Sequence, residues 1–420
     1  MIKSTRYVQI LLLFALAASA LGGFPSAGRA AQLGTAQFRQ DLQFFARELP
    51  RRHKNAFHYS TREQFQTAVE ELDSKLNDLD EDGFFVGLMR VMAMIGDSHS
   101  HPGLPPETES EYPIVIQNIT EAYRVMQVLP GYEKALGTHV VKIDDTPADR
   151  FYPILSRLAT QNENPNYAPA LVSVYLRTSN ILHGAGIAAK SDTARFTFED
   201  DSGQQFALDL PAIPSAKYKD AKWIPFGERL LNRIGEPMHN ATPTFSFTYI
   251  SSSRTVYASI RQMVDVAEPA KQLFQFIRER QPDKLVIDLR QNPGGNYFHG
   301  LHGLIEPIAK MPGVNRKGHL FVLIGALTGS AAIANSSQFH TMTQAILVGQ
   351  PIGAKPAEYS ERGSMTLPNT RILVYYSIRF YDFSYNGENV IRPDQEIKTT
   401  WDDVKNGRLP VLQWCLDYKN

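Results

Sequence analysis

The chain has almost no cysteine, since Cys415 is the only one among its 420 residues. A single thiol cannot form an internal disulfide, and no cysteine or histidine spacing matches a zinc or redox motif. We expect Cys415 to be buried in a C-terminal helix, because its segment VLQWCLDY is mostly apolar. Apolar residues make up 43% of the chain, which is ordinary for a globular protein with a hydrophobic core.

An excess of charge of either sign is also missing. The chain has 43 basic and 43 acidic residues, and no long block of one sign. This balance argues against a nucleic-acid partner and against binding to an anionic membrane surface. The charged fraction of 20% argues against disorder, and no internal repeat or low-complexity tract occurs. The length suggests two or three domains, since about 100–200 residues per domain is usual.

Long hydrophobic runs are rare, and the one that stands out extends from Ile10 to Leu21. It follows a basic start and is accompanied by small residues such as Ala20 and Ala30, which are typical of cleavage sites. The run is too short for a spanning helix, so we predict a secretory signal peptide over residues 1–31. The expected product is exported, periplasmic or extracellular, and without a stable membrane span after cleavage. An uncleaved membrane anchor is the alternative.

The spacing of apolar residues divides the first half of the remaining chain into a helical region and a β-rich region. Residues 35–105 are predicted to form an N-terminal helical region, because apolar residues recur at spacings of three and four. Thr61 is a candidate helix start within it. Residues 110–215 contain short β-rich runs separated by Gly, Pro and Asp, with helical character around 151–177. The segment YRVMQVLPGYEKALGTHVVKIDDTPADRF resembles half of a PDZ-like module, so a small, partly PDZ-like subdomain is expected here.

Residues 240–420 alternate between strand and helix patterns. TVYASI, KLVIDL, HLFVLIGA and AILVG are near-continuously apolar, and amphipathic segments such as EPAKQLFQFIRERQ separate them. This alternation predicts the α/β class, with a parallel sheet covered by helices on both faces. RILVYYSIRFY adds a further β element.

Unusual residues follow two of these apolar strands. Gly294 and Gly295 end the segment LVIDLRQNPGGNY, and Ser330 ends LFVLIGALTGS. In open α/β sheets ligands bind beyond the carboxyl ends of the strands. A serine hydroxyl beside the N–H groups of a glycine turn and of a helix start has the layout of a nucleophile with an oxyanion hole. Taken singly, a serine before a helix is usually only an N-cap and Asn-Pro-Gly-Gly only a turn. The pattern G-x-S-x-G is absent.

A nucleophilic serine needs a base, and two candidates occur. Lys355 lies past the end of the next strand, where burial would have to lower its pKa. His99 lies in the loop GDSHSHPG, and a histidine acts near neutral pH with little tuning. Asp97, His99 and His101 at alternate positions also raise the alternative of a metal site, but the companion motifs of metalloenzymes are missing, so no metal and no cofactor are expected.

These segments resemble the S41 serine peptidases, the tail-specific or C-terminal processing proteases, to which the tricorn core protease is related. KLVIDLRQNPGGN, LTGSAAIANSSQF, AILVGQPIGAKPAEY, IRPDQEI and DDVKNGRLPVLQW follow in the family's order, and GDSHS resembles an element that closes its N-terminal helical region. The resemblance covers most of the mature chain and is strongest from about 283 to 416. It implies a ClpP/crotonase-like catalytic domain over 240–420.

The resemblance also implies site residues. Ser330 stands in the nucleophile's place, and Lys355 matches the lysine that processing proteases pair with it. Tricorn-like members use a histidine instead, with a second serine and a glutamate, for which His99, Ser98 and, loosely, Glu388 are the matches. We prefer Lys355 as base, with His99 close behind.

The implied oxyanion donors are the N–H groups of Gly294 or Gly295 and of Ala331. The loop from Pro351 to Lys355 departs from the usual Pro-Thr-Gly-Gly-Lys, and the PDZ-like element is incomplete. The expected function is an exported serine endopeptidase that cleaves peptide or protein substrates through an acyl-enzyme on Ser330. A non-catalytic protein that binds peptides or lipids on the same scaffold is the alternative, and a hydrolase of other acyl compounds is a third reading.

Overall fold

The computed structural model describes residues 33–120, 122–218, 221–227 and 234–419. The predicted signal peptide, residues 1–31, lies outside this part of the chain. Within the described ranges, no helix combines the length and the apolar character needed to cross a membrane.

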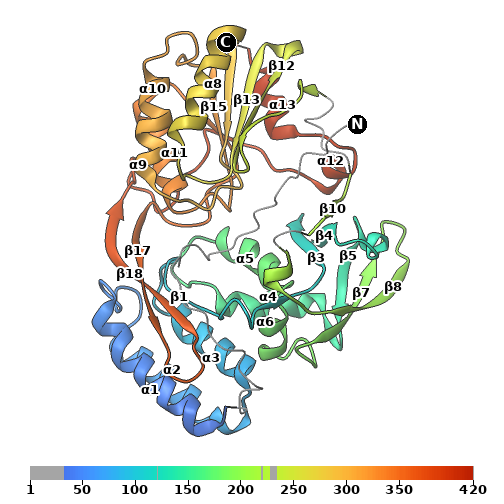
Figure 1. Ribbon diagram of the computed structural model, residues 1–420, viewed down its shortest axis with the longest axis vertical. Helices are drawn as coiled ribbons and strands as arrows, with labels where there is room; N and C mark the ends of the chain where they lie inside the picture. Colours follow the sequence, from blue (N-terminus) through green and yellow to red (C-terminus); the bar gives the residue numbers. More distant parts are fainter. Residues whose placement is uncertain (1–32, 121, 219–220, 228–233, 420) are drawn as a thin grey trace, which may run out of the picture.

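Three helices begin the described chain, as the periodicity of residues 35–105 predicts (Figure 1). They are α1 (Thr35–Arg52), α2 (Arg62–Asp73) and α3 (Glu81–Ala93). Thr61 is the N-cap of α2, because its hydroxyl accepts a hydrogen bond from the Gln64 N–H at 3.2 Å and the Gln64 side chain returns one to the Thr61 N–H. The chain leaves α3 through Gly96, whose φ of +88° favours glycine, and enters the loop that carries His99.

A β-rich part with three short α-helices follows. Its strands are β1 (His101–Gly103), β2 (Ser110–Glu111), β3 (Ile114–Ile119), β4 (Ala122–Val128), β5 (His139–Ile143), β6 (Thr146–Pro147), β7 (Thr193–Glu199), β8 (Gln205–Pro211), β9 (Ile213–Pro214) and β10 (Ile224–Pro225). Its helices are α4 (Phe151–Leu155), α5 (Tyr167–Tyr175) and α6 (Ser179–Gly184), with a 3₁₀ turn over Ser156–Leu158. One antiparallel sheet has the strand order β10-β4-β5-β7-β8, with β3 and β6 paired beside it.

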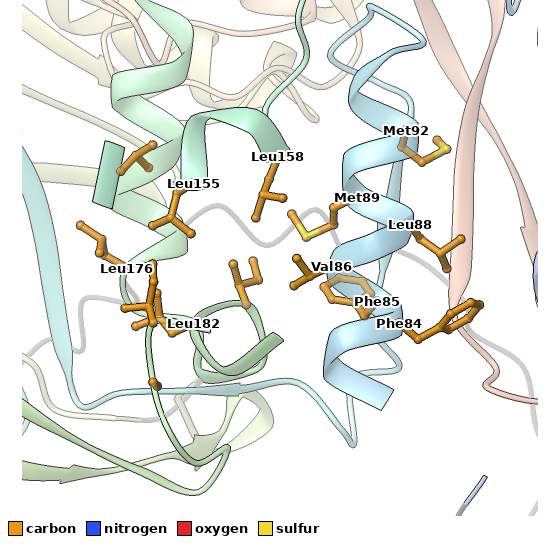
Figure 2. Close-up of a cluster of buried hydrophobic side chains, with 14 of the residues drawn as sticks. Phe84, Phe85, Val86, Leu88, Met89, Met92, Leu155, Leu158, Leu176 and Leu182 are labelled. Atoms are coloured by element: carbon orange, nitrogen blue, oxygen red, sulfur yellow. The ribbon is translucent and has the colours of Figure 1, made fainter. Parts of the chain in front are cut away.

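The N-terminal helices and the β-rich part share one hydrophobic core. Figure 2 shows Val86 and Met89 of α3 facing Leu155, Leu158 and the helices that follow them. Burying one large apolar side chain contributes roughly 1.5–3 kcal/mol. This shared core therefore fixes α3, from which the loop that carries His99 begins.

The third part is a second seven-stranded sheet, in the order β11-β12-β13-β14-β15-β16-β19. The strands are β11 (His239–Thr242), β12 (Phe245–Ile250), β13 (Thr255–Ile260), β14 (Lys284–Asp288), β15 (Leu320–Ile324), β16 (Ile346–Gly349) and β19 (Gln395–Glu396). β13, β14, β15, β16 and β19 are parallel neighbours, and β11 and β12 extend the sheet antiparallel. The prediction of an α/β sheet with parallel strands is confirmed.

Helices cover both faces of this parallel sheet. They are α8 (Ala267–Arg280), α9 (Tyr297–Gly300), a π-helical turn (Leu301–Ile305), α10 (Glu306–Ala309), α11 (Ala331–Met342), α12 (Trp401–Lys405) and α13 (Pro410–Asp417). Alternate strand residues belong to different clusters: Ile287 packs with residues of α8 and α11, and Val286 packs with Val411 and Cys415 of α13. Cys415 is fully buried in this C-terminal helix, as predicted.

A long hairpin links the parallel sheet to the N-terminal helices (Figure 1). It consists of β17 (Ala357–Thr366) and β18 (Leu373–Asp382), and β1 pairs with the outer side of β18. The segment RILVYYSIRFY is thus a strand, as predicted, but it belongs to this hairpin and not to the parallel sheet. The hairpin turn is held by Asp41 of α1, which accepts hydrogen bonds from the N–H groups of Asn369 at 2.9 Å and Thr370 at 2.8 Å.

Candidate active site

The glycine turn and Ser330 lie against each other at the carboxyl ends of β14 and β15. A methyl group placed on Gly294 would lie 2.5 Å from Ser330 Cβ and 3.0 Å from the Ala331 nitrogen. Any side chain at position 294 would therefore fill the space in front of Ser330. Asn292 fixes the turn, because its amide donates to Ile260 O and its carbonyl oxygen accepts from the Gly294 N–H, both at 2.9 Å.

Ser330 has a strained backbone, with φ of +48° and ψ of −122°. Non-glycine residues with positive φ are uncommon and cluster at functional sites. Although Ser330 precedes α11, its side chain makes no capping hydrogen bond. The ordinary explanation of a serine at this position, an N-cap, therefore does not hold.

Two backbone N–H groups face the space beside Ser330. Met263 pairs with Gly295 in a parallel bridge, using the O atom of Gly294 and the N–H of Asn296. In such a bridge the N–H of the central residue, Gly295, is directed away from the neighbouring strand. Among the hydrogen bonds of the described residues, none uses the N–H of Gly295 or of Ala331. The N–H of Gly294 donates to Asn292 instead, so of the three predicted donors Gly295 and Ala331 are the two that remain open.

His99 approaches Ser330 from the N-terminal part of the chain. Its Nε2 lies 3.0 Å from Ser330 Oγ, a hydrogen bond between residues 231 positions apart. The imidazole is buried, and this burial lowers the pKa of His99 to about 4. The ring is therefore neutral at neutral pH, as a base must be.

The other ring nitrogen of His99 faces Ser98 and Glu358. Nδ1 lies 3.1 Å from Ser98 Oγ, and Ser98 donates its own proton to Glu358 Oε2 at 3.2 Å. Because Ser98 Oγ then accepts, Nδ1 carries the proton and Nε2 presents its lone pair to Ser330. Ser360, two residues after Glu358 on β17, also lies 3.2 Å from Nε2.

Glu358 is a buried acid whose Oε2 lies 3.7 Å from His99 Nδ1, and this imidazole is neutral at neutral pH. Burial, together with the nearby carboxylates of Glu163 and Asp97, raises the pKa of Glu358 well above the usual value, while the Ser98 hydroxyl opposes this. Perturbed acids of this kind are frequent at functional sites.

Asp97 holds the loop that presents His99. Its carboxylate accepts hydrogen bonds from His53 Nε2 at 2.8 Å, from Ser377 Oγ at 2.7 Å and from Ser100 Oγ at 3.0 Å. The His99 N–H also donates to it, at 3.2 Å. Burial alone would raise the pKa of Asp97, but these donors hold it below its usual value.

Lys355 is not brought to Ser330. Its ammonium donates to Asn162 Oδ1 at 2.7 Å, and its backbone N–H donates to Glu163 Oε2 at 2.8 Å. Lys355 and Ser330 both lie in the described part of the chain, and no hydrogen bond joins them.

Glu388 is also not at the site. It lies on an exposed loop and forms an ion pair with Arg392 at 3.4 Å. Glu358 occupies the position beside Ser98 that the resemblance suggested for Glu388.

The three residues of the metal alternative have other partners. Asp97 and His99 make the hydrogen bonds described above, and His101 Nδ1 contacts the carbonyl oxygen of Pro102 at 3.2 Å. Within the described part of the chain, no group of three His, Cys, Asp or Glu side chains is placed to hold a metal ion.

Sequence reasoning missed several residues of this arrangement. They are His53, Asn292, Glu358 and Ser360. Glu358 and Ser360 alternate with Tyr359 on a strand, a spacing that places them on one face, but the sequence does not show which face meets His99.

Comparison with known proteins finds similar folds among solved structures. No family model and no curated protein sequence matches the chain. Solved structures do: mature CPAF complexed with lactacystin matches with a TM-score of 0.58 and 12% identity, over 91% of this chain and 97% of that one. A CPAF mutant matches with a TM-score of 0.60 and 12% identity, over 92% and 99% of the two chains.

A more distant likeness, with a TM-score of 0.41 and 14% identity over 86% and 93% of the chains, is to the photosystem II D1 C-terminal processing protease. CPAF is an S41-type peptidase. On the two CPAF matches, this chain has the fold of the S41-type peptidases.

Proposed function

We propose that the chain is a serine peptidase in which Ser330 is the nucleophile and His99 the general base. The observation that carries this proposal is the 3.0 Å contact between His99 Nε2 and Ser330 Oγ, made beside the glycine turn. This reverses the sequence-based preference for Lys355, because the Lys355 ammonium is bound to Asn162.

The proposed reaction proceeds through an acyl-enzyme. Ser330 Oγ attacks the carbonyl carbon of the peptide while its proton passes to His99 Nε2. The negative carbonyl oxygen is stabilised by the N–H groups of Gly295 and Ala331, and each such donor lowers the barrier by roughly 2.7–4 kcal/mol. The intermediate collapses as Nε2 gives the proton to the leaving amine. Water then hydrolyses the ester, with His99 taking and returning a proton once more.

Ser98 and Glu358 have positioning roles in this scheme. The chain from Glu358 through Ser98 to Nδ1 selects the tautomer in which Nε2 accepts a proton. An ionised Glu358 also stabilises the imidazolium that forms during attack, although Ser98 stands between them.

The test of this function is peptide cleavage by purified protein and by Ser330→Ala. We expect cleavage by the first and none by the second. His99→Ala should lower kcat by roughly 10²–10⁴-fold, the usual contribution of a general base. Lys355→Met should retain activity within about tenfold, because this lysine acts only through Asn162 and the loop. Equal cleavage by Ser330→Ala would refute the proposal, and a larger loss in Lys355→Met than in His99→Ala would restore the lysine as base.

We also propose export of the protein, on the pattern of residues 1–31, and the division into a helical region (35–105), a partly PDZ-like subdomain (110–215) and a ClpP/crotonase-like catalytic domain (240–420). Determining the N-terminal residue of protein collected outside the cytoplasm tests the export. A start at Met1 would favour the uncleaved anchor instead.

A further inference from the structure

We propose that the site selects peptides with an aromatic or large aliphatic side chain within two residues of the scissile bond. The side chains that receive it are Tyr297, Phe298, Tyr381 and Phe383, here called the aromatic wall. The inference rests on the proposed peptidase function and adds a substrate class to it.

The first half of the aromatic wall follows directly on the oxyanion turn. Gly295 is exposed, and Tyr297 and Phe298 begin helix α9 after Asn296, whose side chain caps the helix. Asn335 of α11 holds this start by donating to the Tyr297 carbonyl oxygen at 2.9 Å. An extended substrate advances roughly 3.3 Å per residue. Because α9 begins two residues after Gly295, we infer that a peptide bound at the Gly295 N–H has side chains close to Tyr297 and Phe298.

The second half comes from the hairpin, on the same face as the partners of His99. Tyr381 pairs with Glu358 across β17 and β18, and directly opposite residues of an antiparallel pair share a face. Phe383 continues this face, because its N–H donates to the Pro356 carbonyl oxygen at 3.0 Å. The strand face that carries Glu358 and Ser360 to His99 therefore continues into two aromatic rings.

The two halves meet. The Tyr297 ring lies 5.2 Å from the Phe383 ring and 5.9 Å from the Tyr381 ring, and 4.1 Å from that of Phe298. These contacts join the start of α9, two residues after Gly295, to the hairpin.

The surface of this wall is aromatic and partly open, since Tyr297, Tyr381 and Phe383 are half-buried and Phe298 is exposed. Phe298 is 48% exposed, and Val264, next to the Met263 that pairs with Gly295, is 42% exposed. Exposed apolar groups gathered beside a catalytic serine indicate a binding surface. The charged groups of the hairpin beside the wall have partners. Arg379 pairs with Glu361 at 2.9 Å, the Tyr381 hydroxyl donates to Glu361, and Asp382 accepts from the Ser384 N–H at 2.9 Å. The wall therefore favours an apolar side chain over a charged one.

The experiment begins with a mixture of unstructured synthetic peptides that present every residue type, with cleavage sites identified by mass spectrometry. Matched peptides with Phe or Ala at the preferred position then give a ratio of kcat/KM. We expect a ratio of at least roughly tenfold for the wild type, the usual discrimination of an apolar pocket. Phe298→Ser should lower this ratio several-fold. Phe380→Ser is the control, because Phe380 is equally exposed at 49% but lies on the opposite face of the hairpin, against Tyr359.

The outcomes separate the inference from the proposed function. Cleavage that depends on Ser330 but shows no apolar preference, or a ratio changed equally by both Phe variants, overturns the inference alone. Cleavage that survives Ser330→Ala, or no cleavage of any peptide, overturns the proposed function and the inference with it.

Discussion

At the scale of single residues, the site depends on two glycines that no other residue replaces. Gly294 has φ of +120° and lies against Ser330, and Gly295 has φ of +137° and lies 2.4 Å, measured from an added Cβ, from the Met263 carbonyl oxygen. Both positions need the left-handed region and close backbone approach, which only glycine provides without strain.

Replacing Gly294 by alanine is expected to remove most of the activity. The new methyl group would occupy the space before the Ala331 N–H, so the oxyanion would lose at least one donor. We expect kcat to fall by roughly 10²–10³-fold. Gly131→Ala is the control, because Gly131 also has positive φ, +99°, but no neighbour within 4 Å of the added methyl. Equal effects of the two changes on kcat would show that backbone strain, and not the blocked oxyanion space, is responsible.

The pH dependence should report Glu358 and not His99. The pKa of His99 is about 4, so this base is neutral over most of the usual range. Glu358, crowded by Glu163 and Asp97, keeps its proton to higher pH than an ordinary glutamate. When protonated, it can donate to Ser98, which then donates to Nδ1 and leaves Nε2 without its lone pair. We therefore expect kcat/KM to rise with pH as Glu358 ionises.

Glu358→Gln tests this assignment, since the amide oxygen still accepts from Ser98 but does not titrate. The rise of kcat/KM should move down toward pH 4, where His99 itself titrates. A pH profile measured from 4 to 9 that has the same acid limb in both proteins would contradict the role of Glu358.

Some of these residues were predictable from the sequence and others were not. Gly294, Gly295 and Ser330 stand at the ends of apolar strands, so their meeting followed from the parallel order of β14 and β15. Lys355 follows a strand and matches a family position, and Glu388 matches one loosely, but a matching position does not determine where a side chain points. Contacts with Asn162 and Arg392 direct them elsewhere.

At the scale of secondary-structure elements, the hairpin β17–β18 supplies side chains that surround His99. It leaves the parallel sheet, carries Glu358 and Ser360 to His99, and reaches α1 with its turn. The parallel strands were predictable because each is buried on both faces and reads as a continuous apolar run. Of the hairpin, β18 was predictable as a β element, but β17 was not, because KPAEYSERG reads as a polar loop. The pairing of β17 with β18 and the contact with His99 are long-range.

The hairpin turn should depend on Asp41. This carboxylate is fully buried and accepts from the backbone of Asn369 and Thr370 and from the Thr370 hydroxyl at 2.7 Å. Asp41→Ala leaves these donors without partners, at a cost of about 1–3 kcal/mol each. We expect a clear fall in Tm and in kcat, because the same hairpin holds Glu358.

Asp209→Ala serves as the comparison for Asp41→Ala. Asp209 forms an ion pair with Arg195 in which both side chains are more than 60% exposed, at 62% and 63%. Such pairs contribute only about 0–1 kcal/mol. Equal shifts of Tm for the two aspartate variants would show that the turn contacts of Asp41 are unimportant.

At the scale of the whole molecule, residues 160–164 contact two loops that come from distant parts of the sequence. Thr160 donates to the Asp97 carbonyl oxygen at 3.0 Å, Asn164 donates to the Ile352 carbonyl oxygen at 2.6 Å, and Glu163 accepts from Lys355. Residues 160–164 therefore join the loop of His99, which precedes β1, to the loop of Lys355, which connects β16 of the parallel sheet to the hairpin.

The stability of the protein should decrease from about pH 5 to pH 8 through Glu163. Burial raises its pKa to about 8, despite the hydrogen bonds from Lys355 and Ser98. In this window the folded state keeps a proton that the unfolded state has lost, so the free energy of unfolding falls with rising pH, by up to about 1.4 kcal/mol per pH unit. Above pH 8 both states are ionised and this slope ends.

Glu163→Gln should flatten this slope. Denaturant unfolding at pH 5, 6, 7 and 8 gives the comparison, and the variant should gain stability relative to the wild type as the pH rises. Titration of Glu358 also makes the free energy of unfolding depend on pH, and this dependence is common to both proteins. A constant difference in the free energy of unfolding across the four pH values would rule out titration of Glu163 in this range.

The separation of His99 and Ser330 by 231 positions has a consequence for synthesis. Until the ribosome has translated residue 330, the nascent chain holds the imidazole but no partner hydroxyl. Under the proposed function, a partly synthesised chain that ends before Ser330 therefore cannot cleave other proteins at its site of synthesis.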